Sequence, residues 1–250
     1  MTWVIPRRNS VYHSGRSSPE IECRAQFVSR RAGISLSGSH AMYHVHAFAT
    51  PNSVKVPIAL EELGIDYTLH AVNIRKGEQK SDAFLTLNAN GKVPVLTTED
   101  RDFVLTESAA ILVYLAEKHG KLLSQEPVRR ARTFEQLFVH ASGLSPAFGQ
   151  SGYFLKFAPQ PLPHAIERFS SEAKRQLKLL NAILAGQAFA ASDKYSIADI
   201  AHFGWIWRRA FANLALDETP HVQRWYDAML ARVAVTKAIG KLERLANTNG

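Results

Sequence analysis

The fold of this chain is decided by residues 90–111, which read NGKVPVLTTEDRDFVLTESAAI. Residues 92–96 have a strand pattern, and residues 102–105 return as the hairpin partner of that strand after a polar turn. The run 107–119 then has the spacing of an amphipathic helix. Its buried stripe is predicted to hold Ala109, Ile111, Leu112 and Leu115. Two strands followed by a covering helix predict one edge of a small sheet domain.

The chain before this stretch supplies the other half of the sheet. Residues 43–48 read as a strand and residues 68–73 as a second strand. Between them, residues 54–63 have helical spacing, and Gly64 stops that helix. Because one helix connects the two strands, we expect them to run parallel. A polar loop at 75–81 and a short helix at 82–87 complete a domain with a mixed four-stranded sheet over residues 42–120.

Strand patterns vanish beyond Gly120, and only helical spacing remains. Helices are predicted at 129–141, 162–184, 197–211, 222–230 and 236–245. Glycine and proline are concentrated at 143–152 and 158–163, where we expect loops. Ser196 and Asp199 have the spacing of a capping box, which predicts a role in folding. The fold class is therefore α/β plus all-α, with an all-helical C-terminal domain over residues 127–247.

Residues 1–41 differ from the rest of the chain. They are rich in serine, arginine and glycine and show no sustained hydrophobic period, which predicts a disordered or non-native N-terminal extension. A targeting peptide is the alternative, because arginine and serine are enriched there. Glu20 and Glu22 count against that alternative, as does the lack of an apolar central segment.

Charge and hydropathy limit the classes of partner. The net charge of +8 is shared between the extension, with six arginines and two glutamates, and a body with 24 basic and 20 acidic side chains. No basic stripe interleaved with aromatic residues is present, so we expect no nucleic-acid partner. No apolar run approaches the ~20 residues of a spanning helix, so we expect no membrane partner.

Cysteine and histidine usage limits the chemistry. Cys23 is the only cysteine, which excludes an intrachain disulfide and favours a reducing, cytoplasmic compartment. His44 and His46 alternate on a predicted strand, and no third ligand stands at metal spacing. We therefore expect no metal site.

Two positions in the deciding stretch have more than one interpretation. Pro94 removes a ladder donor from its strand, which marks either an ordinary edge strand or a cis peptide bond. Glu107 and Ser108 stand at a helix start, where acidic and hydroxyl side chains are common caps. The same helix start also suits a ligand carboxylate, because its free N–H groups and positive dipole end attract anions.

Three blocks of sequence carry a family resemblance. They are ATPNSVK at 49–55, NGKVPVL at 90–96 with LTESAAI at 105–111, and GLSP at 143–146 running on to Gly149-Gln150. In this order and spacing they resemble the glutathione transferases over about residues 42–246. Within that family they are most similar to the bacterial nu class of disulfide-bond oxidoreductases and to a fungal prion-forming relative. The resemblance implies a thioredoxin-like N-terminal domain followed by the helical domain.

The resemblance implies how glutathione would be bound. The bond before Pro94 would be cis, so that the backbone of Val93 pairs with the cysteinyl backbone of the tripeptide. Ser108 would donate to the γ-glutamyl carboxylate, and Glu107 would balance the neighbouring ammonium. Gln79 and Lys92, from two loops flanking the same groove, would hold the glycyl carboxylate.

The resemblance also implies where the chemistry occurs. No Tyr or Ser directly follows the first strand, and Thr50 and Asn52 fit the nu-class pattern of thiol-activating donors instead. Arg168 matches a position whose guanidinium faces the active-site cleft. The aromatic residues Phe148, Tyr153 and Phe154 would wall the second-substrate pocket. Without the resemblance, Thr50 and Asn52 are also ordinary residues of a capped turn.

The implied activity is glutathione-dependent reduction of disulfide bonds, with conjugation or peroxide reduction as side activities. Glutathione, in reduced or disulfide form, would be the substrate together with a small disulfide or electrophile. The resemblance also implies a homodimer. A conventional conjugating transferase and a non-catalytic regulatory module remain the alternatives, because the fold alone does not choose among them.

Overall fold

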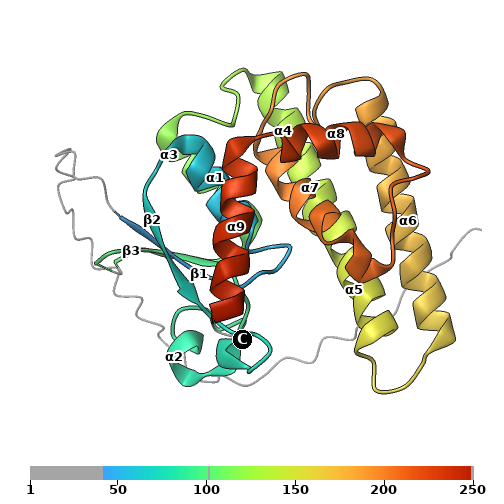
Figure 1. Ribbon diagram of the computed structural model, residues 1–250. Coiled ribbons are helices and arrows are strands. Elements are labelled where there is room, and N and C mark those ends of the chain that lie inside the picture. Colours follow the sequence, from blue (N-terminus) through green and yellow to red (C-terminus); the bar gives the residue numbers. More distant parts are fainter. Residues whose placement is uncertain (1–41, 101, 249–250) are drawn as a thin grey trace, which may run out of the picture. The chain divides into compact units, whose positions relative to one another are not determined.

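The computed structural model describes residues 42–100 and 102–248, shown in colour in Figure 1. The predicted extension, residues 1–41, lies outside the described residues, and so does Cys23. All the elements below belong to the described part of the chain.

A mixed sheet of four strands forms the first half, as the sequence predicted. Its strands are β1 (Tyr43–Ala47), β2 (Tyr67–Ala71), β3 (Val95–Thr98) and β4 (Val104–Leu105), in the order β2-β1-β3-β4. β1 runs parallel to β2 and antiparallel to β3, which pairs antiparallel with β4. Burial alternates along β1, because Tyr43, Val45 and Ala47 point into the core.

Two helices pack against this sheet. α1 (Lys55–Leu63) and α3 (Ser108–His119) contact each other, and both end at a left-handed glycine, Gly64 and Gly120. Pro57 lies in the first turn of α1, where its missing N–H costs no helical hydrogen bond. The short elements η1 (Glu78–Lys80) and α2 (Asp82–Leu85) lie between β2 and β3.

The second half is helical. Its elements are α4 (Pro127–Val139), η2 (His140–Leu144), α5 (Ser145–Lys156), α6 (Pro163–Ala185), α7 (Ile197–Trp207), η3 (Arg209–Ala212), α8 (Pro220–Leu230) and α9 (Val233–Thr248). α7 contacts α1 and α3, and one apolar core runs through both halves. No helix in the described ranges is long and apolar enough to cross a membrane.

Ion pairs join the last helix, α9, and Arg232 just before it to the sheet domain. Figure 1 shows it (red) beside α1, which it contacts. Lys237 Nζ lies 2.6 Å from Glu61 Oε2, and Arg232 Nε lies 2.5 Å from Glu62 Oε1. The C-terminal helix is therefore part of the support for α1.

One predicted loop is wrong. Residues 143–152 were expected to be irregular because of their glycines, but they lie in η2 and α5. A Cβ at Gly152 would lie 2.0 Å from the ring of Phe211, and a Cβ at Gly143 would lie 2.7 Å from Nε2 of Gln176. These glycines allow close helix packing and do not make turns, which the sequence pattern alone does not distinguish.

Two other expectations concern element starts. The predicted strand at 92–96 begins only at Val95, since Pro94 has no amide hydrogen for the ladder. The capping box is confirmed, because Ser196 N donates to Asp199 Oδ2 at 2.9 Å and Ala198 N donates to Ser196 Oγ at 3.3 Å. Asp199 also accepts from the indole of Trp225 at 3.0 Å, so it ties α7 to α8.

Candidate functional site

The turn between β1 and α1 holds the first candidate residues. Thr50 Oγ1 donates to Ser53 Oγ at 2.9 Å and accepts from the Ser53 N–H at 3.1 Å. These bonds place Ser53 fully inside the protein and leave Thr50 and Asn52 half-buried at the surface. In this arrangement the Thr50 hydroxyl hydrogen is used in a bond within the turn. Donation to a ligand requires that hydrogen to rotate away from Ser53.

Lys55 joins the candidate residues of two elements. Its Nζ lies 2.8 Å from Asn52 Oδ1, 3.2 Å from Ser108 Oγ and 2.7 Å from His140 Nε2. The side chain is only 1% exposed. The structure thus brings Asn52 and Ser108 together through a buried lysine that the sequence analysis did not single out.

Burial and neighbouring charges shift the pKa values of Lys55 and His140. Burial lowers the pKa of Lys55 to about 7, and the nearby charge of Glu107 partly opposes this shift. Burial, together with the charges of Lys55 and His202, lowers the pKa of His140 well below its usual value. His140 is therefore neutral, and its Nε2 is an acceptor for the ammonium of Lys55.

The start of α3 has no side-chain cap among the described residues. Glu107, which precedes the helix, is exposed. Its backbone has φ 64° and ψ 110°, a conformation that residues other than glycine rarely adopt. No side chain caps the helix, so the interpretation of Glu107 as an ordinary cap does not hold. Strained backbone of this kind persists where the surroundings enforce it, often at ligand sites.

The two loops that carry Gln79 and Lys92 pack against each other. The Val93–Pro94 bond is cis, as the resemblance implied. A Cβ at Gly91 would lie 3.1 Å from the carbonyl oxygen of Gln79, so the loop before Val93 packs on η1. Lys92 is exposed and its carbonyl accepts from Asn88 Nδ2 at 2.7 Å. The expected meeting of the Gln79 and Lys92 loops is therefore present.

The three aromatic candidate residues of the helical half differ in how deeply they are buried. Phe148 is fully buried and packs edge to face against Trp205. Tyr153 is 43% exposed and packs on Phe154, which stacks on Phe169. Of the three aromatic residues, Phe148 thus lies in the core and Tyr153 reaches solvent.

Arg168 stands apart from the buried lysine and its partners. It is exposed on α6, one turn before Glu172. Hydrogen bonds from Arg175 and Gln176 lower the pKa of Glu172 to about 2, and the charge of Arg168 adds to the effect. Within the described ranges, no hydrogen bond or ion pair joins Arg168 to another candidate residue.

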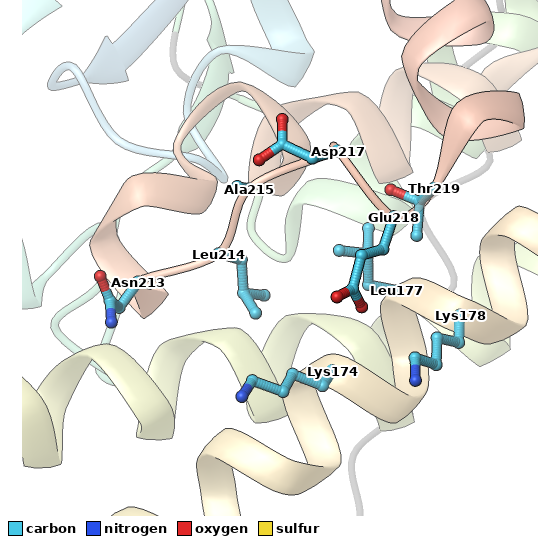
Figure 2. A pocket seen from close by; sticks show the side chains of 9 residues that line it. All are labelled: Lys174, Leu177, Lys178, Asn213, Leu214, Ala215, Asp217, Glu218 and Thr219. Carbon is cyan, nitrogen blue, oxygen red and sulfur yellow. The ribbon is translucent and has the colours of Figure 1, made fainter.

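A separate hollow lies in the helical half. It measures about 400 Å³ and is lined by α6 and the segment 213–219 (Figure 2). Figure 2 shows Lys174 and Lys178 on α6 and Glu218 on the segment 213–219 around this hollow. None of the candidate site residues lines this hollow, so it is not the site described above.

Comparison with known proteins assigns both halves of the chain to one family. Residues 49–118 match the model "Glutathione S-transferase, N-terminal domain", and residues 146–232 match "Glutathione S-transferase, C-terminal domain". The disulfide-bond oxidoreductase YfcG of Escherichia coli (strain K12) is 37% identical over 81% of this chain and 96% of its own.

Solved structures agree with this assignment. A glutathione transferase from Pseudomonas putida, with one glutathione disulfide bound per subunit, is 37% identical with a TM-score of 0.73, over 80% of this chain and 91% of its own. A family member from Pseudomonas fluorescens, with two glutathione molecules bound, is 35% identical with a TM-score of 0.75, over 82% and 95%. The chain therefore belongs to the glutathione S-transferase family.

Proposed function

We propose that this protein reduces disulfide bonds with glutathione, through a site between the β1–α1 turn and the start of α3. One observation carries the proposal. Asn52, expected at the thiol end of glutathione, and Ser108, expected at its γ-glutamyl end, are held by the same Nζ of Lys55. The name of YfcG supports the same activity, and the neighbours with bound glutathione or its disulfide support glutathione as the ligand.

The tripeptide would be bound along its whole length. Ser108 and the uncapped N-terminus of α3 would take the γ-glutamyl carboxylate, with Glu107 beside the ligand ammonium. The backbone of Val93, before the cis bond to Pro94, would pair with the cysteinyl backbone. Gln79 and Lys92 would hold the glycyl carboxylate from their two adjoining loops.

The sulfur chemistry would then be carried by glutathione itself. The Asn52 amide, with the Thr50 hydroxyl, would stabilise the thiolate after its proton passes to water. The thiolate attacks one sulfur of the disulfide, an S–S bond forms to glutathione, and the other sulfur leaves as a thiolate that takes up a proton. A second glutathione thiolate resolves the mixed disulfide in the same way and yields glutathione disulfide. The described residues include no cysteine, so this sequence involves none of them as a sulfur donor.

The second substrate would lie against the helical half. Tyr153, which is 43% exposed, and Phe154, which packs on it, would form its wall, whereas Phe148 lies in the core. Arg168 would supply a positive charge to an anionic disulfide such as a glutathione adduct. These assignments predict a preference for disulfides that contain glutathione.

We also propose that two copies associate through an apolar face beside the site. A hollow of about 500 Å³ there is lined by β4, α3 and α4, and its lining includes Phe103, Val113, Phe134 and Phe138. Phe138 is 68% exposed in the single chain. An exposed apolar patch of this kind marks an interaction surface.

The homodimer has a direct test. Light scattering at micromolar concentration should give twice the chain mass, and Phe138→Lys should shift the mass toward the monomer because a charge would be buried in the interface. Val233→Lys, at an apolar residue that is 79% exposed and does not line this hollow, is the control. A monomer mass for the unmodified protein would contradict the dimer.

The activity has a direct test too. Turnover with glutathione should be compared in parallel for a glutathione mixed disulfide, a peroxide and an aryl halide. We expect the disulfide to be reduced fastest and well above the rate of free glutathione. Equal rates with and without protein would refute the enzyme, and faster turnover of the aryl halide would favour a conjugating transferase. A reducing, cytoplasmic location suits this chemistry, since it keeps glutathione in its thiol form.

A further inference from the structure

Lys55 is a buried cation for which the proposed chemistry has no direct role. A lysine ammonium has three donors and no acceptor. Its three partners, Asn52 Oδ1, Ser108 Oγ and His140 Nε2, all lie within 3.2 Å. Each donor therefore has one acceptor, and the buried charge is fully hydrogen-bonded, which is the condition for tolerating it inside a protein.

This geometry dictates which atoms face the ligand. Because Lys55 only donates, Asn52 must turn its oxygen toward the ammonium, and its Nδ2 donors are directed away from it. Ser108 likewise accepts from Lys55, so its own hydrogen is available to another acceptor. Asn52 and Ser108 therefore both present hydrogen-bond donors to the ligand. A thiolate and a carboxylate are acceptors and need such donors.

The third partner comes from the helical half. His140 lies in η2 and is fully buried. With Nε2 accepting from Lys55, its ring hydrogen is on Nδ1, which has no hydrogen-bond partner among the described residues. α7 closes the other side, since a Cβ at Gly204 would lie 3.2 Å from Cε of Lys55. The lysine is therefore held in place by both halves of the chain.

We propose that Lys55 is a positioning residue of the glutathione site, which keeps Asn52 and Ser108 oriented as donors toward the ligand. The inference rests on the proposed function for the identity of the ligand. It adds a role to a residue that touches neither of the predicted substrates and acts through two side chains that do.

Loss of the lysine proton should undo this orientation. A neutral amine keeps two donors and gains a lone pair, so one of its three partners must become a donor to it. If Ser108 supplies that hydrogen, or Asn52 turns its amide, the site loses a donor for the ligand. If His140 supplies it by moving its proton from Nδ1 to Nε2, Asn52 and Ser108 still lose the positive charge that orients their oxygens. The ionisable groups that face Lys55 are Glu107 before α3, His140 in η2 and His202 in α7, and both histidines are buried and neutral. The pKa of Lys55, about 7, places the change near neutral pH.

The experiment is calorimetric binding of S-methylglutathione, which has no thiol proton, between pH 6 and pH 8. For the unmodified protein we expect the affinity to fall by about threefold or more across this range, because binding favours the protonated lysine. Lys55→Met should bind about tenfold more weakly at pH 6 and show no such fall. Lys55→Gln, which keeps N–H donors without a charge, should also lose the pH dependence.

Two control variants distinguish a positioning role of Lys55 from a general loss of stability. Lys178→Met removes an exposed lysine of α6 and should leave the profile unchanged. Met229→Ala, in the buried face of α8, lowers stability in the helical half and should keep the pH dependence.

Several outcomes would overturn the inference. A pH-independent affinity of the unmodified protein would do so even if both Lys55 variants failed to fold. The same pH profile in Lys55→Met as in the unmodified protein would do so as well. Failure of the unmodified protein to bind glutathione or its S-methyl form at any pH would instead contradict the proposed function.

Discussion

Asn52 is the residue on which the proposed sulfur chemistry depends most directly. Its oxygen faces Lys55 at 2.8 Å, so its amide hydrogens are the donors left for a thiolate. A hydrogen bond to a charged group contributes about 1.5–3 kcal/mol. We therefore expect Asn52→Ala to lower disulfide turnover by about tenfold or more while glutathione affinity changes little. Steady-state kinetics and calorimetry measure the two effects.

Asn52→Asp is the matched variant for that prediction. An aspartate has nearly the same shape and still accepts from Lys55, but it has no hydrogen to donate. Turnover should fall at least as far as in Asn52→Ala. Turnover equal to that of the unmodified protein in Asn52→Asp would remove the amide donor from the mechanism.

Ser108 is expected to act on binding and not on the sulfur. Removal of its hydroxyl in Ser108→Ala takes away one donor to the γ-glutamyl carboxylate and one acceptor of Lys55. The dissociation constant of glutathione should rise about tenfold or more. Ser142→Ala, an exposed serine that bonds only the carbonyl of Phe138, is the control and should bind normally. An unchanged constant in Ser108→Ala would place the carboxylate elsewhere.

Residue-level prediction from sequence succeeded where a motif carried the information. The cis bond at Val93–Pro94 is present, and Asn52 and Ser108 do lie within reach of one side chain. Lys55 and His140 were missed because a lysine in an amphipathic helix is usually solvated and a histidine on a helix carries no motif. The available signals were the apolar neighbours of Lys55, Val54 and Val56, and the position of His140 in the buried stripe of α4 and η2.

At the scale of elements, α7 determines how closely the helical half approaches the site. Ten consecutive residues, from Ile197 to Ile206, are buried, so no polar face marks its orientation in the sequence. Gly204 is the point of contact, because a Cβ there would lie 2.0 Å from the carbonyl oxygen of Pro51. That oxygen belongs to backbone and has little freedom to move.

Gly204→Ala should therefore displace α7 from the β1–α1 turn. Overpacking of a well-packed contact typically costs about 1–3 kcal/mol, so the melting temperature should fall. Glutathione affinity should fall as well, since Pro51 adjoins Asn52. Gly186→Ala is the control, because nothing lies within 4 Å of a Cβ at that position. Equal stability of the two variants would show that the contact adapts without cost.

Glycine explains where element prediction failed. The run 143–152 has the composition of a loop, yet its glycines lie in η2 and α5 against Gln176 and Phe211. The contact that requires a glycine there is made by a residue distant in sequence, and no local pattern reports it. The parallel pair β1–β2, the hairpin β3–β4 and the helices α1 and α3 were predicted correctly because their periods and stop signals are local.

At the scale of the whole molecule, the two halves meet over buried ionisable groups. Lys55 of the sheet domain lies against His140 of η2, and the ring of His140 packs edge to face on His202 of α7. Protonation of either histidine would add a second buried positive charge beside the lysine. The stability of the junction between the halves should therefore depend on pH.

The sign of that dependence follows from the pKa values. Burial lowers the pKa of His202 from 6.5 to about 3, and that of His140 also falls well below 6.5. The unfolded chain thus binds more protons than the folded chain below pH 6.5, and the free energy of unfolding should decrease as pH falls. Between pH 8 and pH 5 the loss is about 2 kcal/mol for His202, and His140 adds to it in the same direction. This window lies above the usual titration range of carboxylates, so the two histidines account for most of the loss. Lys55, whose pKa burial lowers to about 7, adds to it at the upper end of the window.

Urea unfolding at pH 8, 6.5 and 5 measures this loss. His202→Leu should reduce it by about 2 kcal/mol, since an apolar side chain of similar size has no proton to gain in the unfolded state. His164→Leu, at an exposed histidine of α6, should leave the pH dependence as it is. If both variants lost the same free energy between pH 8 and pH 5 as the unmodified protein, His202 would not be a buried neutral base. The pH sensitivity would then have to come from other ionisable groups, of which His140 and Lys55 lie in the same junction.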